Sequence, residues 1–113
     1  VADDLPDSNP IKAVSKDFIA KYQAKWGPGP VTPFAGYAWD AMLLLDNAAK
    51  TALKTAKPGT EAFRLTLRDA LDSGTEVVGT NAVYKFTKAD HYGVDERARV
   101  LVMVKDGRFR LAK

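Results

Sequence analysis

The stretch Phe34-Ala35-Gly36-Tyr37-Ala38-Trp39-Asp40-Ala41 opens the longest helix that the sequence predicts. We expect this helix to begin around Ala35 and to run to about Thr55, because apolar residues recur along it at three- and four-residue spacing. The resulting face is wide enough to be buried against a sheet. Its members are Ala38, Ala41, Met42, Leu45, Ala48, Ala49, Ala52 and Leu53.

A shorter amphipathic helix is predicted before this stretch. Ser8 or Asn9 can cap its free N–H groups, and Pro10 suits a first helical turn. The glycine- and proline-rich segment 27–30 ends it, and residues 31–34 form an extended link to the long helix. Its apolar stripe consists of Ile11, Val14, Phe18, Tyr22 and Trp26.

A third helix is predicted after the long one. Pro58-Gly59 breaks the long helix, Thr60 can cap the next, and Asp72-Ser73-Gly74 ends it. Its stripe is Phe63, Leu67, Ala70 and Leu71.

Short strands are predicted in the last third of the chain. The segments Val77-Val78-Gly79-Thr80 and Val83-Tyr84-Lys85-Phe86 are rich in β-branched and aromatic residues. Ala98 to Val104 is predicted to form a further strand, and Asp106-Gly107 is a strong hairpin signal leading into Phe109 to Ala112.

The three predicted helices lack the strands that such apolar faces need. Nothing between them resembles the buried, β-branched run of a parallel strand. We therefore interpret the chain, which begins at Val1 without an initiator methionine, as cut or processed from a longer protein whose upstream part encodes the central strands. The alternative is a compact α+β domain that stands alone.

Composition places the chain among ordinary globular proteins. Of its 113 residues, 46% are hydrophobic and 27% charged, and no apolar run approaches the ~20 residues that cross a bilayer. Cysteine is absent, which excludes disulfides, thiolate metal sites and a cysteine nucleophile.

Positive charge is concentrated towards the C-terminus. The net charge is +3, and the segment 96–113 holds six basic residues against Glu96 and Asp106. Nucleic-acid binding is one reading of such a patch. The favoured reading is that these residues occupy outward positions of two strands, because no aromatic platform accompanies them. We expect no nucleic-acid partner.

The candidate chemical groups are sparse. His91 lies in Asp90-His91-Tyr92-Gly93 and could be a metal ligand or a proton carrier, but it is the only histidine and lies in a glycine-containing connection. No serine lies in a nucleophile-elbow motif, and no phosphate-binding loop is present. We expect no enzymatic activity, metal or cofactor.

One constellation could contact a ligand. Tyr37 and Trp39 lie at the start of the long helix beside small residues, where N–H dipoles and apolar rings are presented together. The alternative is that the two rings only anchor this helix to the rest of the domain.

The order of these motifs resembles the last third of a periplasmic solute-binding protein of the branched-chain amino-acid type, from ATP-binding-cassette importers. The resemblance is carried by Tyr22-x3-Trp26-Gly27, the Phe34–Ala41 stretch, Phe63-Arg64-x3-Arg68-Asp69-Ala70-Leu71 and Val78-Gly79-Thr80. The later segments Val83–Phe86, Asp90–Gly93 and the closing hairpin fit it as well.

The resemblance implies an α/β fold of two lobes with a ligand cleft between them. Residues 1–94 would belong to the first lobe, and residues 95–113 would form a hinge crossing and the terminal hairpin of the second. It also implies a cleft-facing position before Tyr37, which is Phe34 or, with a shifted register, Thr32. These three residues are the predicted ligand-binding residues.

The implied function is reversible capture of a small organic ligand, namely an amino acid, an amide or an aromatic carboxylate. The implied location is periplasmic or extracytoplasmic, and the implied partners are a membrane permease and the upstream lobes. A ligand-sensing domain of a receptor or regulator, or a self-standing interaction domain, are the alternatives. We also expect the isolated chain to self-associate through its uncovered apolar stripes.

Overall fold

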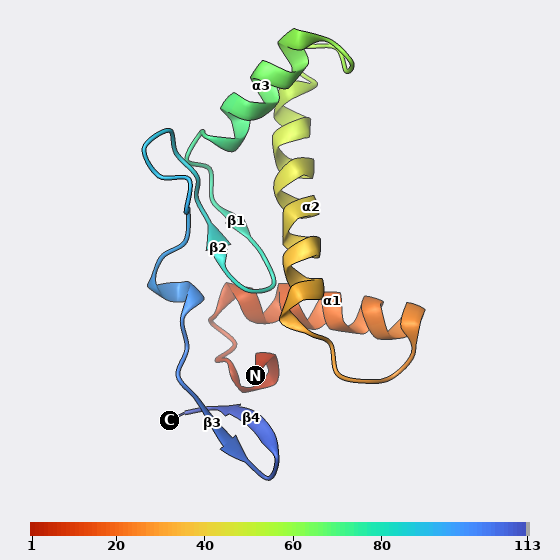
Figure 1. Ribbon diagram of the computed structural model, residues 1–113, viewed down its shortest axis with the longest axis vertical. Helices are drawn as coiled ribbons and strands as arrows, with labels where there is room; N and C mark the ends of the chain where they lie inside the picture. Colours follow the sequence, from red (N-terminus) through yellow and green to blue (C-terminus); the bar gives the residue numbers. More distant parts are fainter. Residues whose placement is uncertain (113) are drawn as a thin grey trace.

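The computed structural model describes residues 1–112, in which three α-helices precede two small antiparallel hairpins, as the sequence predicts (Figure 1). The shape is elongated, with extents of 53 × 33 × 21 Å. Lys113, the last basic residue of segment 96–113, lies outside the described residues. Within residues 1–112, no helix has the length and apolar character required to cross a membrane.

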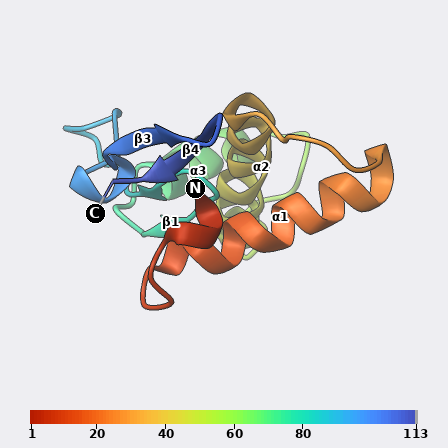
Figure 2. The same ribbon diagram turned by 90° about the horizontal axis from the view of Figure 1, so that it is seen from below.

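Helix α1 spans Pro10–Trp26 and confirms the first predicted helix. Asn9, rather than Ser8, caps it, because the Asn9 side-chain oxygen accepts a hydrogen bond from the Ile11 N–H at 3.0 Å. The helix ends at Gly27, whose φ of 91° is in the region that favours glycine. α1 lies across one end of the long helix α2 (Figures 1 and 2).

Helix α2 spans Pro33–Ala52, so it begins two residues earlier and ends three residues earlier than predicted. It begins earlier because Pro33, with its fixed φ, starts the helix instead of preceding it. Leu53, Lys54 and Thr55 continue as turns whose N–H groups donate to carbonyls of the last helical residues.

The predicted apolar face of α2 is buried only near its C-terminal end. Ala48 and Ala52 are buried on α2, which packs closely against α3. Met42 and Leu45, however, are 63% and 43% exposed. The expected burial of the whole face is therefore not met in this chain by itself, because no segment within residues 1–112 covers the first half of that face.

Helix α3 spans Glu61–Leu71 and packs beside the second half of α2 (Figure 1). Its predicted cap is confirmed, since the Thr60 hydroxyl accepts a hydrogen bond from the Phe63 N–H at 3.2 Å.

The first hairpin pairs β1, Val77–Val78, with β2, Val83–Tyr84. β1 is shorter than predicted, because the backbone at Thr80 and Asn81 turns to hydrogen-bond with a helical side chain. β2 ends at Tyr84, after which the Lys85 N–H donates to the Gly93 carbonyl. Val83 packs with Leu5 and Ile11 in the small core, and Val78 lies against them.

The second hairpin pairs β3, Val102–Lys105, with β4, Arg108–Leu111. The turn at Asp106-Gly107 is confirmed, and both residues have positive φ, as a tight hairpin turn requires. β3 begins four residues later than predicted, because Ala98 belongs to a short 3-10 helix, η2, at Glu96–Ala98, and the ladder with β4 starts only at the Val102–Leu111 pair. As expected, this hairpin is set apart from the helices, at the opposite end of the molecule from α3 (Figure 1).

The register gives the second hairpin two unlike faces. Directly opposed residues share a face, and the faces alternate along each strand. One face is apolar and carries Val102, Val104, Phe109 and Leu111, whereas the other carries Met103, Lys105, Arg108 and Arg110. The basic residues Lys105, Arg108 and Arg110 therefore occupy one face of a strand pair, in agreement with the favoured reading of the positive charge.

Candidate ligand-binding site

A hollow in the described chain has a volume of about 510 Å³. It lies between the starts of α1 and α2, the Thr80-Asn81 turn and the apolar face of the second hairpin. Its wall combines apolar side chains, such as Leu5 and Phe109, with neutral polar ones, such as Asn81. A small organic molecule is the kind of ligand that such a lining suits.

The structure brings two of the three predicted ligand-binding residues to this hollow. Thr32 and Tyr37 line it, whereas Phe34 is 79% exposed and is not part of the lining. The Phe34 ring meets the Tyr37 ring edge to face, with centroids 6.1 Å apart. Phe34 therefore supports the position of Tyr37 from outside the hollow.

Trp39 has a different role from Tyr37. Its ring packs against Phe18 of α1, with centroids 5.4 Å apart, and the Lys21 ammonium lies 5.8 Å from its centre. Trp39 thus fits the anchoring alternative, since it joins α2 to α1.

A buried carboxylate that the sequence analysis did not single out fixes the wall of the hollow. Asp40 is 1% exposed. Its two oxygens accept hydrogen bonds from the Thr80 N–H at 2.5 Å, the Asn81 N–H at 3.2 Å and the Tyr84 hydroxyl at 2.9 Å. Burial and the Asp40 carboxylate together raise the pKa of Tyr84, so its hydroxyl remains a donor.

The Thr80-Asn81 turn is also fixed by a hydrogen bond from α1 and by the close approach of the α2 backbone. The buried Ser15 hydroxyl donates to the Thr80 carbonyl at 2.5 Å. A Cβ atom at Gly36 would lie 2.6 Å from both the Asn81 Nδ2 and the Thr80 Oγ1 atoms, so α2 can approach the turn only with glycine there. The polar wall of the hollow is therefore rigidly attached to both helices.

A signal for Asp40 exists in the sequence. It is an acidic residue within the Tyr-x-x-Asp-Ala start of an otherwise apolar helix, flanked by Trp39 and Ala41. Carboxylates in such surroundings are seldom buried unless they are hydrogen-bonded.

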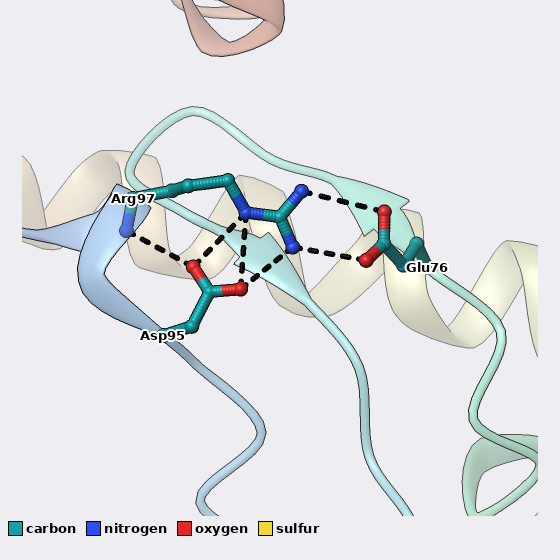
Figure 3. A network of polar contacts seen from close by, with 3 residues as sticks. All are labelled: Glu76, Asp95 and Arg97. Atoms are coloured by element: carbon teal, nitrogen blue, oxygen red, sulfur yellow. Dashed lines mark hydrogen bonds and ion pairs between the residues drawn. The ribbon is translucent and has the colours of Figure 1, made fainter.

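Arg97 lies at the edge of the hollow, but two carboxylates already occupy its guanidinium group (Figure 3). Its Nη2 atom donates to Asp95 at 2.7 Å and to Glu76 at 2.9 Å, and its Nε atom donates to Asp95 at 3.0 Å. Hydrogen bonds from Arg97 lower the pKa of both Glu76 and Asp95. Arg97 therefore does not present an uncompensated positive charge to a ligand.

Comparison with solved structures finds matches over the whole described fold. An extracellular ligand-binding receptor from Rhodopseudomonas palustris HaA2 is 38% identical, with a TM-score of 0.90. A second extracellular ligand-binding receptor from Rhodopseudomonas palustris is 36% identical with a TM-score of 0.90, and a protein of Rhodopseudomonas palustris strain CGA009 is 39% identical with a TM-score of 0.89.

The chain has the fold of part of an extracellular ligand-binding receptor. The predicted fold class, an α/β portion with three helices followed by short strands and a terminal hairpin, is confirmed. Each alignment covers 99% of this chain, which spans 31% of the length of each matched protein. No protein-family model matches the chain, and the comparison with curated proteins found no relative.

The remaining candidate groups do not gather into a reactive site in this receptor-like fold. His91 lies on an exposed connection, where its Nε2 atom is 3.2 Å from an oxygen of Asp72. Ser15 is occupied by its bond to Thr80, and Ser73 lies beside Thr75 at 2.8 Å. In the described residues 1–112, no three acidic, histidine or cysteine side chains are placed to hold a metal ion.

Proposed function

We propose that this chain is the C-terminal part of a two-lobed solute-binding protein of the branched-chain amino-acid type, which works outside the cytoplasm. The protein would capture a small organic ligand, namely an amino acid, an amide or an aromatic carboxylate, and deliver it to the permease of an ATP-binding-cassette importer. In this proposal residues 1–94 belong to the first lobe and residues 95–113 to the hinge and the second. The chain would perform no catalysis.

The observation that carries the proposal is the match of 99% of the chain to a receptor three times as long, at 38% identity. The exposed apolar face of α2 and the exposed hairpin favour the same reading over a self-standing domain, because both require a covering segment. The hollow lined by Thr32 and Tyr37 is the part of this chain that would contact the ligand.

A thermal-shift screen of the intact protein tests this proposal. We expect a higher melting temperature with one class among L-amino acids, amides and benzoate-like acids, because a ligand that binds only the folded state stabilises it. No shift with any class at millimolar concentration would contradict the proposed binding function.

The ligand-sensing alternative shares the proposed ligand binding and differs only in what the ligand-bound protein then acts on. A fused output domain in the parent protein would favour sensing, whereas an adjacent permease gene would favour import.

A further inference from the structure

The terminal hairpin is joined to the helical part of the molecule by residues 95–101, here called the crossing segment. Arg97 lies in this segment and bridges it to Glu76, which directly precedes β1 (Figure 3). Two guanidinium nitrogens donate to the two Glu76 oxygens, Nη2 at 2.9 Å and Nη1 at 3.4 Å. The Asp95 carboxylate accepts hydrogen bonds from the same guanidinium group and also from the backbone N–H of Arg97, at 2.9 Å.

A second polar contact holds the open end of the hairpin, away from its turn. The Asp4 carboxylate accepts hydrogen bonds from Arg110 Nη1 at 3.0 Å and from the Leu111 N–H at 3.2 Å. Asp4 belongs to η1, a short 3-10 helix at Ala2–Asp4, next to α1. The hairpin is thus tied to the helical part at two separate points.

Apolar packing contributes little to the placement of this hairpin. Leu101, Val104 and Phe109 are between 67% and 81% exposed. The hairpin's apolar face borders the 510 Å³ hollow, whose lining also includes Leu5 and Phe18. The orientation of the hairpin therefore depends on the polar contacts.

We propose that Arg97 is a hinge latch, which holds the crossing segment against Glu76 and thereby restrains the angle between the terminal hairpin and the helical part. The latch is a positioning device, because Glu76 and Asp95 already occupy the guanidinium group of Arg97. Bidentate guanidinium–carboxylate pairs restrain direction as well as distance, which suits Arg97 to this role.

The latch acquires a functional consequence that rests on the proposed function. If the hairpin belongs to the second lobe, the latch biases the angle between the two lobes and so the population of the closed, ligand-holding state. Apparent affinity scales with the fraction of molecules in the binding-competent state. Loosening Arg97 would then change ligand affinity through the equilibrium between the open and closed states.

Distance measurement between two spin labels in the intact protein tests the latch directly. The labels are placed at Thr51→Cys, on the exposed side of α2, and Lys105→Cys, at the hairpin turn; this chain has no cysteine of its own. A large excess of unlabelled protein removes distances between molecules. We expect a narrow distribution with Arg97 intact and a distribution at least twice as broad in Arg97→Gln and in Glu76→Gln.

Arg99→Gln is the matched control, because Arg99 is an exposed arginine of the same segment that forms no ion pair within residues 1–112. It should leave the distribution unchanged. Arg97→Lys should give an intermediate width, since lysine keeps the positive charge but not the two guanidinium nitrogens that donate side by side. Helical circular dichroism of every variant verifies that the helices remain folded.

Equal widths for Arg97→Gln and Arg99→Gln would overturn the latch. Its failure is distinguishable from failure of the proposed function, because label distances do not require a ligand. A protein that broadens as expected but shows no thermal shift with L-leucine, an amide or benzoate retains the latch and loses the proposed function.

Discussion

Asp40 is the residue on which the wall of the hollow most depends. It joins α2 to the Thr80-Asn81 turn and to Tyr84 through three hydrogen bonds, all made by one buried carboxylate. Removing the acceptor would leave the N–H groups of Thr80, which is buried, and of Asn81, which is half-buried, without their partner, and such groups are costly to bury.

Asp40→Ala should therefore lower the free energy of unfolding by about 3 kcal/mol. Asp46→Ala is the control on the same helix, since Asp46 pairs only with Lys50 at the surface, and it should cost less than about 0.5 kcal/mol. Urea unfolding of the intact protein measures both variants. Equal destabilisation would show that the buried contacts do not contribute as described.

Tyr37 and Phe34 make a second prediction at the residue scale. Tyr37 lines the hollow and Phe34 does not, so Tyr37→Ala should weaken ligand binding about tenfold. Phe34→Ala should have a smaller effect, through loss of the edge-to-face contact alone. Calorimetric titration with the compound that gives the largest thermal shift measures both, and Tyr92→Ala, an exposed tyrosine outside the hollow, is the control. A larger loss in Phe34→Ala would reverse this assignment.

The Glu76–Asp95–Arg97 contacts should respond to acid. Arg97 lowers the pKa of Glu76 from its ordinary value of 4.5 and that of Asp95 from 3.8. Nearby Lys85 also lowers the pKa of Glu76, while the Asp95 carboxylate partly opposes that shift. Because both pKa values are lowered, the contacts are complete above about pH 4.5 and are lost only as the pH falls through the lowered pKa values, below 4.5 for Glu76 and below 3.8 for Asp95. The Arg97 Nε–H resonance should shift through that window, whereas that of Arg99 should not.

Helix α2 shows, at the scale of elements, what could be predicted from the sequence. The periodicity of α2 was sufficient to predict a long helix, because it is a local signal. The helix breaks at Gly27 and Pro58 and the hairpin turn at Asp106-Gly107 were predictable for the same reason. The start of α2 was displaced because the same residue, Pro33, is compatible with ending a link and with opening a helix.

Contacts between residues far apart in the sequence could not be predicted from it. Asp40 meets Thr80 across forty residues, and Arg97 meets Glu76 across twenty-one, and neither pairing leaves a local pattern. The length of β1 was overestimated for the same reason, since Asp40 diverts the backbone at Thr80 from the strand ladder. The motif order did indicate the α/β receptor-like fold, because it samples the whole chain.

A charge on the uncovered face of α2 should benefit the 113-residue chain by itself and harm the intact protein. Leu45→Lys should reduce self-association of the 113-residue chain, because Leu45 is exposed there. In the intact protein the same change should lower the free energy of unfolding by about 3 kcal/mol, since a buried lysine would replace a packed leucine. Light scattering and urea unfolding measure the two effects. Thr51→Lys, at an exposed polar position of α2, should produce neither.

The whole chain combines a very small buried core with long exposed apolar surfaces. Leu5, Ile11 and Val83 form the central cluster, while Met42, Leu65 and the apolar face of the second hairpin remain accessible. Surfaces of this kind seldom stay uncovered in water. The 113-residue chain by itself should therefore self-associate, as light scattering at micromolar concentration can determine. A monomer that unfolds cooperatively would instead favour the self-standing domain.

The contact between Asp4 and Leu111 brings the two ends of the chain together, 107 residues apart in sequence. Closing so long a loop carries a large entropic cost, so this contact gains little until the intervening helices have already shortened the loop. The hairpin, whose own turn closes locally, can form early yet must dock late. The last event in the folding of this chain is then the meeting of its ends, and exchange of the Leu111 amide proton should report that event more readily than any amide in the middle of α2.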